Sequence, residues 1–264
     1  MQIEWSRETV EIREAGSGPS LLLVHGYPLD GAMWSPVARR LSERFRVVKP
    51  DLPGRAGNPT GPSGSLETYV DFVEAVLENL EAPVGLAGFS MGGYISLALM
   101  RRRPARVAAL ALIDTRAVAD DEAGKKKRDE SIAILKDHGV EPIANAILPK
   151  LLSPDGMSRK DLVERVRRII LRQTPAALES DLAAMRDRKD STDLLRELAL
   201  PTLVVAGEHD AISPAAESQA LAHAIPGARF VQIAGAGHLT PMEAPAAVAK
   251  ALGDFFEENL KSNV

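Results

Sequence analysis

The fold of this protein is decided by one stretch, Val84-Gly85-Leu86-Ala87-Gly88-Phe89-Ser90-Met91-Gly92-Gly93-Tyr94. It opens with a short apolar run typical of a buried strand, and a helical pattern follows it as far as Met100. The change from strand to helix requires a very tight turn, which predicts a strained backbone at Ser90. Glycines two residues before and after this serine let neighbouring segments approach closely. The pattern favours a serine nucleophile exposed at a strand end over a serine that only occupies a turn.

Similar apolar runs recur along the chain and are separated by helical patterns. Each run is continuously apolar, which is typical of parallel strands buried on both faces. Residues 66–80 place their apolar side chains on one helical stripe, with Ser65 as the expected N-cap. This alternation predicts an α/β fold: a mostly parallel open sheet with helices on both faces. The predicted strands are residues 21–24, 46–49, 84–89, 107–113, 202–206 and 229–233.

The alternation stops between residues 115 and 193, a charged stretch with helical spacing and no strand pattern. The basic run Lys125-Lys126-Lys127-Arg128 is flanked by acidic residues, so we interpret it as a solvated helix face. We predict a core formed by residues 1–114 and 194–264, with residues 115–193 inserted as a helical cap over the mouth of the sheet. The expected breaks between its short helices are Pro142, Pro149, Pro154 and Pro175.

Composition restricts the possible partners. The 264 residues are 45% hydrophobic and 26% charged, as in ordinary soluble globular proteins. The absence of cysteine excludes disulfides, thiolate metal sites and cysteine nucleophiles. A formal net charge of -4 gives no reason to expect a nucleic-acid partner. The N-terminus lacks a signal-peptide pattern and no apolar run approaches the roughly 20 residues of a membrane span, so we expect a cytoplasmic protein without membrane association.

Several further segments complete the pattern that begins at the serine turn. Together, in this order and at this spacing, they are specific, and the chain resembles the α/β-hydrolase family over nearly its whole length. Among members it is similar to bacterial carboxylesterases and 3-oxoadipate enol-lactonases. The family places a serine, an acid and a histidine in that order along the chain. The matching segments are Val24-His25-Gly26-Tyr27-Pro28, Pro50-Asp51-Leu52-Pro53-Gly54, Gly207-Glu208-His209-Asp210 and Gly235-Ala236-Gly237-His238.

A serine hydroxyl needs a base to take its proton, and the base needs a carboxylate to orient it. His238 follows the last predicted strand in a glycine-rich loop that can reach the nucleophile, and the resemblance implies the same residue. For the acid the resemblance implies Asp210, and Asp114, which follows the preceding strand, is the alternative. His25 is expected to shape a loop. The remaining histidines are interpreted as a loop residue, His209, and as two surface residues, His138 and His223.

Acyl transfer also needs two donors for the developing oxyanion. The resemblance implies the backbone N–H of Met91, directly after the nucleophile, and that of Tyr27 in the early loop. One departure concerns the segment after the expected strand at residues 46–49. Relatives often carry a glycine at the position of Ala56, and the change affects local loop shape without removing a catalytic group.

The expected function is that of a serine carboxylesterase acting on small to medium esters through Ser90, Asp210 and His238. Serine at position 90 argues against haloalkane dehalogenases and epoxide hydrolases, which carry aspartate there. Tyr94, where some relatives have arginine, argues against a menaquinone-pathway synthase. The alternatives are an enol-lactonase-like lactonase, a perhydrolase, or a noncatalytic receptor for a small ligand. We expect no cofactor or metal, a small ester or lactone as partner, and a monomer or homodimer.

Overall fold

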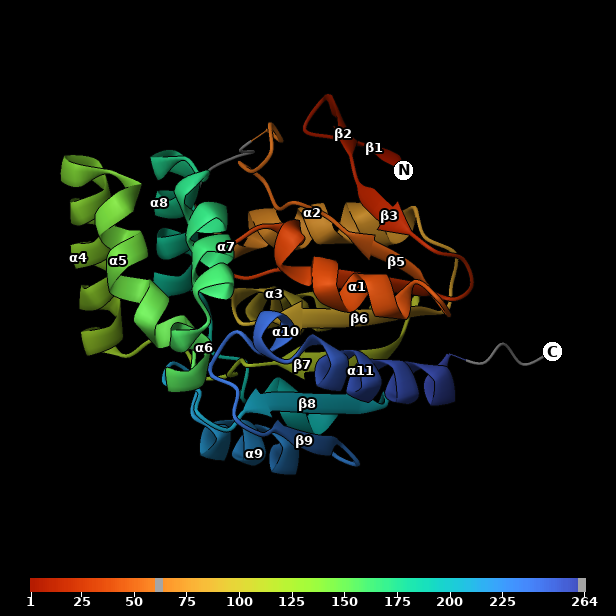
Figure 1. The fold of residues 1–264 in the computed structure, drawn as a ribbon. Coiled ribbons are helices and arrows are strands. Elements are labelled where there is room, and N and C mark those ends of the chain that lie inside the picture. Colours follow the sequence, from red (N-terminus) through yellow and green to blue (C-terminus); the bar gives the residue numbers. More distant parts are fainter. Residues whose placement is uncertain (60–63, 261–264) are drawn as a thin grey trace.

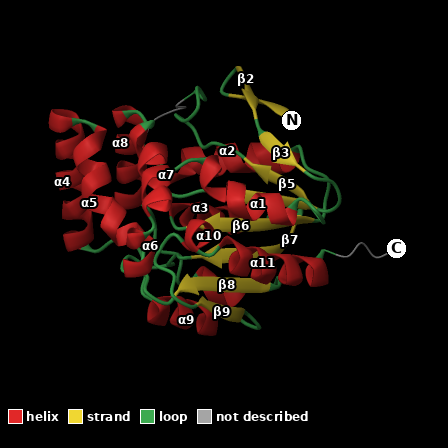
Figure 2. Ribbon diagram, in the orientation of Figure 1, coloured by secondary structure: helices red, strands yellow, loops and turns green. Residues whose placement is uncertain are grey.

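A computed structural model of the chain describes residues 1–59 and 64–260. Its main feature is a seven-stranded sheet with the order β3-β5-β4-β6-β7-β8-β9 (Figures 1 and 2). All neighbours in it are parallel except β3 and β5, which pair antiparallel. The predicted mostly parallel sheet is therefore confirmed. The strands are β3 (Arg13–Ala15), β4 (Ser20–Val24), β5 (Arg46–Lys49), β6 (Val84–Phe89), β7 (Val107–Ile113), β8 (Thr202–Gly207) and β9 (Arg229–Ile233).

The N-terminal strands have no counterpart among the predictions. β1 (Gln2–Trp5) and β2 (Glu8–Glu11) form a separate antiparallel pair, and each buries only one side chain fully. Their patterns are short and mostly polar, so they resemble loops in sequence. Ile3 and Val10 nevertheless join the core, and Trp5 packs edge-on against Phe72 with ring centroids 5.1 Å apart.

Helices cover both faces of the sheet. Alternate residues of β4 and β6 belong to different hydrophobic clusters, which places a separate core on each face. One core includes α2 (Leu66–Glu78), α3 (Met91–Met100) and α9 (Ala215–Ala224), and the other includes α1 (Ser35–Leu41) and α11 (Pro245–Asn259). As predicted, Ser65 caps α2, where its hydroxyl accepts from the N–H of Thr68.

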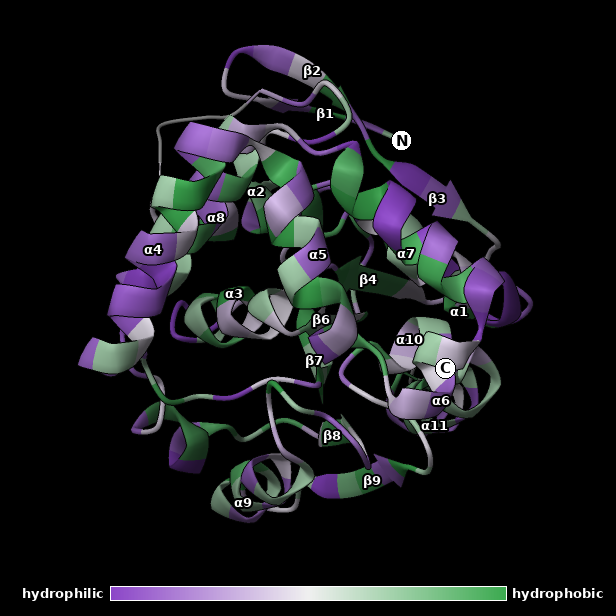
Figure 3. Ribbon diagram, turned by 60° about the vertical axis from the view of Figure 1, so that its left-hand side comes forward, coloured by the Kyte–Doolittle hydropathy of each residue, from purple (hydrophilic) through white to green (hydrophobic). Residues whose placement is uncertain are grey.

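Between β7 and β8, the insertion (residues 115–193) contains helices and no strand, as expected. Its helices gather at the carboxyl ends of the parallel strands (Figure 1). The first of them buries only Leu135 and is largely hydrophilic along its length (Figure 3). The helices are α4 (Glu122–His138), α5 (Val140–Leu151), α6 (Pro154–Ser158), α7 (Lys160–Leu171) and α8 (Pro175–Arg186).

The predicted proline breaks were right at two positions and wrong at two. Pro154 and Pro175 are the first residues of α6 and α8, where the missing N–H would have no partner within the helix. Pro142 lies in the first turn of α5, where the same argument makes it harmless. Pro149 lies inside the last turns of α5, and the helix continues past it for two residues.

Three short helices complete the described chain. They are η1 (Gly31–Trp34), η2 (Leu194–Glu197) and α10 (Thr240–Glu243). The helix η1 follows the loop after β4, and α10 follows the loop after β9. Both loops therefore approach the same end of the sheet as the insertion, which brings segments from distant parts of the chain to one site.

Candidate active site

Ser90 lies in the tight turn between β6 and α3 and has the strained backbone that the sequence predicts. Its φ is 51° and its ψ is -113°, a conformation that favours glycine. The turn leaves no room beside it, because a Cβ on Gly88 would lie 2.4 Å from the carbonyl oxygen of Gly92. A Cβ on Gly92 would lie 2.3 Å from the carbonyl oxygen of Val24. The two glycines are therefore required for this turn to form.

The structure brings together the three side chains that the sequence nominates. The imidazole Nε2 of His238 lies 3.0 Å from the hydroxyl oxygen of Ser90. Its Nδ1 lies 2.8 Å from a carboxylate oxygen of Asp210. The other carboxylate oxygen accepts from the N–H groups of Ile212 and Ser213, at 2.7 and 2.8 Å. These bonds fix the carboxylate, which in turn orients the imidazole toward the serine.

Asp114, the alternative acid, has other partners. Its fully buried carboxylate accepts from the N–H of Gly207 at 2.9 Å and from the hydroxyl of Thr240 at 2.5 Å. Burial, with the charge of the nearby Asp210, raises the pKa of Asp114 well above its ordinary value. Asp114 therefore joins β7 to β8 and α10 beneath the site, while the hydrogen bond to His238 belongs to Asp210.

His25 holds the early loop, as expected. Its Nε2 accepts from the N–H of Leu52 at 3.0 Å, so the ring proton is on Nδ1, which donates to the carbonyl of Gly26 at 3.2 Å. Complete burial and the nearby charge of Arg55 lower the pKa of His25 to about 3. The ring is thus neutral and ties the loop that contains Tyr27 to the loop after β5.

Two ion pairs, neither of them predicted, join the loops after β4 and β5 to the insertion. Asp30 accepts from Nε of Arg172 at 2.7 Å and from the amide of Gln173 at 2.8 Å, just after α7. Burial opposes the charge of Asp30, but the bonds from Arg172 hold its pKa below the usual range.

The second pair is completely buried. Arg55 binds Asp181 of α8 and also donates to the carbonyl of Leu29 at 2.9 Å. The hydroxyl of Tyr69 donates to the same carboxylate at 2.7 Å. The next residue, Ala56, has a φ of 52°, in the left-handed region that favours glycine. A glycine, which the family resemblance implies at this position, would adopt this conformation more readily than alanine.

The loop that carries His238 is held by Glu243, which the sequence did not indicate. One of its carboxylate oxygens accepts from the N–H of Gly237 at 2.8 Å. The other accepts from the N–H and the hydroxyl of Ser153, at 2.9 and 2.7 Å. Ser153 precedes α6, so a single buried carboxylate connects the histidine loop to the insertion.

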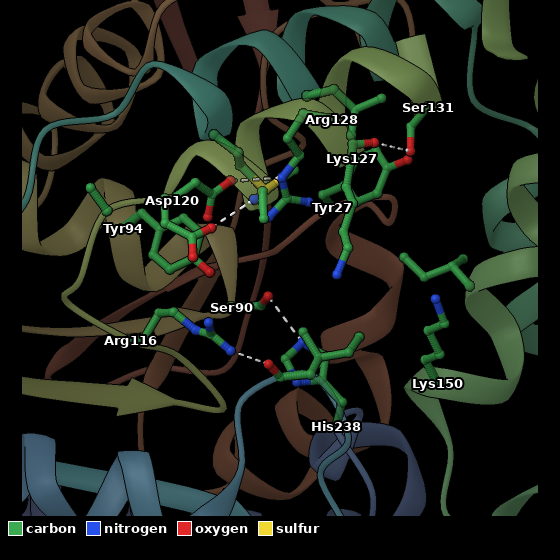
Figure 4. A pocket seen from close by; sticks show the side chains of 18 of the residues that line it. Tyr27, Ser90, Tyr94, Arg116, Asp120, Lys127, Arg128, Ser131, Lys150 and His238 are labelled. Carbon is green, nitrogen blue, oxygen red and sulfur yellow. Dashed lines mark hydrogen bonds and ion pairs between the residues drawn. The ribbon is translucent and has the colours of Figure 1, made fainter. Parts of the chain in front are cut away.

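Ser90 and His238 open onto a cavity of about 600 Å³ between the sheet and the insertion (Figure 4). Residues of α4, α5 and α8 line its outer part, and apolar side chains such as Ile147 and Met185 are among them. The exposed Lys126 and Lys127 agree with the interpretation of the basic run of α4 as a solvated face, but Lys127 and Arg128 also line the cavity. Among residues 1–59 and 64–260, no group of three acidic or histidine side chains is placed to hold a metal ion.

Comparison with known proteins identifies the family. The family model described as "Alpha/beta hydrolase family" matches residues 21–251 of the chain. The chain belongs to the α/β-hydrolase family. The predicted family and fold class are therefore confirmed.

Proteins similar to the chain over most of its length include two esterases and an enol-lactonase. The chain is 32% identical to a pimeloyl-[acyl-carrier protein] methyl ester esterase of Methylococcus capsulatus over 80% of this chain and 84% of the relative. The structure of a thermophilic esterase from Thermogutta terrifontis, with malate bound, is 34% identical, covers 99% of both chains and has a TM-score of 0.93. The enol-lactonase from Burkholderia xenovorans LB400 is 26% identical, covers 97% of this chain and 100% of its own, and has a TM-score of 0.88.

No helix in the part of the chain that the structure describes is both long and apolar enough to cross a bilayer.

Proposed function

We propose that this α/β hydrolase is a serine carboxylesterase for small to medium esters. Ser90 is its nucleophile, His238 is its base, and Asp210 is the carboxylate that orients His238. The observation that carries the proposal is the continuous hydrogen-bonded series from Ser90 through His238 to Asp210, at 3.0 and 2.8 Å, at the floor of a cavity. Names of relatives support the ester substrate, since esterases are among both the sequence and the structural matches.

The mechanism follows from these contacts. The hydroxyl oxygen of Ser90 attacks the ester carbonyl while Nε2 of His238 takes its proton. Asp210 stabilises the imidazolium and keeps its second proton on Nδ1. The tetrahedral intermediate then expels the alcohol, which receives the proton from Nε2, and an acyl-serine remains. Water attacks this acyl group by the same route in reverse, which releases the acid and restores Ser90.

The oxyanion of each tetrahedral intermediate would be bound by the N–H groups of Met91 and Tyr27. Met91 is the first residue of α3, so its N–H has no partner within the helix. Among the described residues, the N–H of Tyr27 has no recorded protein acceptor either. One such donor typically contributes about 3 kcal/mol to transition-state stabilisation. The hydrogen bonds of His25 and Arg55 to neighbouring loop residues support the position of Tyr27.

The insertion, residues 115–193, is proposed to act as the helical cap of this site. It supplies the outer wall of the cavity, and the bonds of Asp30, Arg55 and Glu243 fix it to the loops around Ser90. A cavity of this size accommodates a small or medium acyl chain. The likeness to an enol-lactonase makes a lactone the second candidate substrate.

The test is hydrolysis of 4-nitrophenyl esters from acetate to decanoate, together with an enol-lactone. We expect repeated turnover of short and medium esters and a loss of at least about 10⁴-fold in kcat for Ser90→Ala. Ser131→Ala is a matched control, because Ser131 lines the same cavity but its hydroxyl donates only to the carbonyl of Lys127.

Turnover that persists in Ser90→Ala would remove the proposed mechanism. A wild type that hydrolyses only the lactone would establish the second candidate, and one that binds these compounds without turnover would identify a noncatalytic receptor. Faster consumption of the acyl-enzyme by peroxide than by water would identify a perhydrolase.

A further inference from the structure

The cavity in front of Ser90 contains two cations that no described carboxylate neutralises. Lys127 of α4 and Lys150 of α5 both line it, and their amino groups extend into the open space (Figure 4). Among residues 1–59 and 64–260, neither amino group has a recorded ion pair or hydrogen bond. Arg116, also in the lining, differs because Glu217 lies 3.4 Å from its guanidinium.

The acidic side chains of the lining are already occupied. Asp120 accepts from Nε of Arg128 at 3.0 Å and from Arg188 at 2.8 Å. These bonds hold the pKa of Asp120 below its usual range, although burial opposes them. Asp121 is the N-cap of α4 and accepts from the N–H of Gly124 at 2.7 Å. Asp120 is therefore neutralised by two guanidinium groups and Asp121 caps α4, so neither carboxylate is paired with Lys127 or Lys150.

Helical spacing fixes the direction of both lysines. Lys127 lies four residues after Ala123 and four before Ser131, and all three line the cavity. Lys150 follows Ile143 and Ile147 at intervals of seven and three residues, again on one lining stripe. The orientation of each lysine is thus set by its helix, and both helices are held by contacts with the rest of the insertion.

We propose that the substrate carries a carboxylate in addition to its ester bond, and that Lys127 and Lys150 bind this carboxylate. The inference rests on the proposed function and names its substrate class. An ester seated at Ser90 would extend along the apolar side chains of α5 and α8 and place its carboxylate between the two amino groups. Two cations in a partly enclosed cavity attract such a group more strongly than they would in open solvent.

The experiment compares charged esters with neutral esters of matched shape, by proton release at constant pH. Monomethyl glutarate against methyl pentanoate places the charge on the acyl side, and O-acetylglycolate against ethyl acetate places it on the alcohol side. The proteins are wild type, Lys127→Gln, Lys150→Gln and the double variant. Lys126→Gln is the matched control, because Lys126 is an exposed lysine of the same helix that does not line the cavity.

We expect the wild type to prefer the charged ester of at least one pair. Each single variant should lower the charged-to-neutral ratio of kcat/KM roughly fivefold, and the double variant should lower it further. Added salt should reduce the wild-type ratio, because it screens partly exposed charges. Lys126→Gln should leave the ratio unchanged.

Two results would overturn the inference while the proposed function stands: a wild type that hydrolyses neutral esters without preferring either charged partner, or a double variant with the wild-type ratio. Ser90→Ala separates the two proposals. If neutral esters are hydrolysed equally well without the serine, the proposed function fails first, and the inference fails with it.

Discussion

Replacing His25 should change how the stability of the protein depends on pH. The buried ring is neutral, because its Nε2 accepts from the N–H of Leu52 and would lose this bond on protonation. Burial, with the charge of Arg55, lowers its pKa to about 3, whereas an exposed histidine has a pKa near 6.5. The unfolded chain therefore binds a proton at this residue over a pH range in which the folded chain does not.

The magnitude follows from these two pKa values. The stabilising contribution of the low folded pKa is fully present above about pH 6.5 and is lost as the pH falls toward 3. Between those limits the free energy of unfolding falls by about 1.4 kcal/mol per pH unit because of this one residue. From pH 7.5 to 4.5 the loss from His25 amounts to about 2.5 kcal/mol.

The assay is urea unfolding of wild type and His25→Gln between pH 7.5 and 4.5. The amide oxygen of glutamine can accept from Leu52 but does not titrate, so the variant should lose about 2.5 kcal/mol less than the wild type over this range. Titration of other groups is common to both proteins and cancels in the difference. His223→Gln, an exposed position on α9, is the control for loss of an imidazole. Parallel curves for wild type and His25→Gln would refute the neutral buried ring.

Three further substitutions test the framework of the site. Asp181→Asn leaves the guanidinium of Arg55 buried without its counter-charge and should cost about 3–5 kcal/mol in urea unfolding, while Asp155→Asn, on the exposed side of α6, should cost little. Gly92→Ala should lower stability by about 1–3 kcal/mol or more, measured by thermal unfolding, because its Cβ would overlap the chain at the end of β4. Asp210→Asn should lower kcat on 4-nitrophenyl acetate by about 10³–10⁴ while circular dichroism stays unchanged; a loss below tenfold would contradict its role.

Most of the sheet could be predicted because its strands are buried on both faces. A strand such as β6 needs apolar residues at every position, and this requirement is visible as a continuous run. β1 and β2 lack that requirement, since each contributes one buried side chain to the core, so their sequences look like loops. Pro149 was misjudged for a related reason: a proline near the end of a helix sacrifices one backbone bond, a loss that packing of α5 can offset.

The three side chains of the proposed triad could be nominated because each follows a strand directly in a loop with a distinctive pattern. The residues that hold these loops in place could not be predicted from the sequence. Glu243 acts across 90 residues on Ser153, and Asp181 acts across 126 residues on Arg55. Apart from the N–H of Gly237, six residues before Glu243, neither carboxylate has a local partner, so little near it in the chain distinguishes it from an exposed acid. Its role arises only when the insertion packs against the core.

The run from Lys125 to Arg128 shows, within a single helix, that a role set by packing cannot be predicted from the local sequence. Successive residues of α4 point about 100° apart, so four adjacent basic residues face different surroundings. Lys125 is partly exposed and pairs with Glu122, whereas Lys126 and Lys127 are both exposed and only Lys127 of these two lines the cavity. All four are basic and have equal weight in the sequence, but the docking of α4 places only Lys127 and Arg128 in the cavity lining, and Arg128 is paired with Asp120. The proposed carboxylate specificity therefore depends on how α4 is docked against the site, and a comparison of Lys126→Gln with Lys127→Gln tests that dependence.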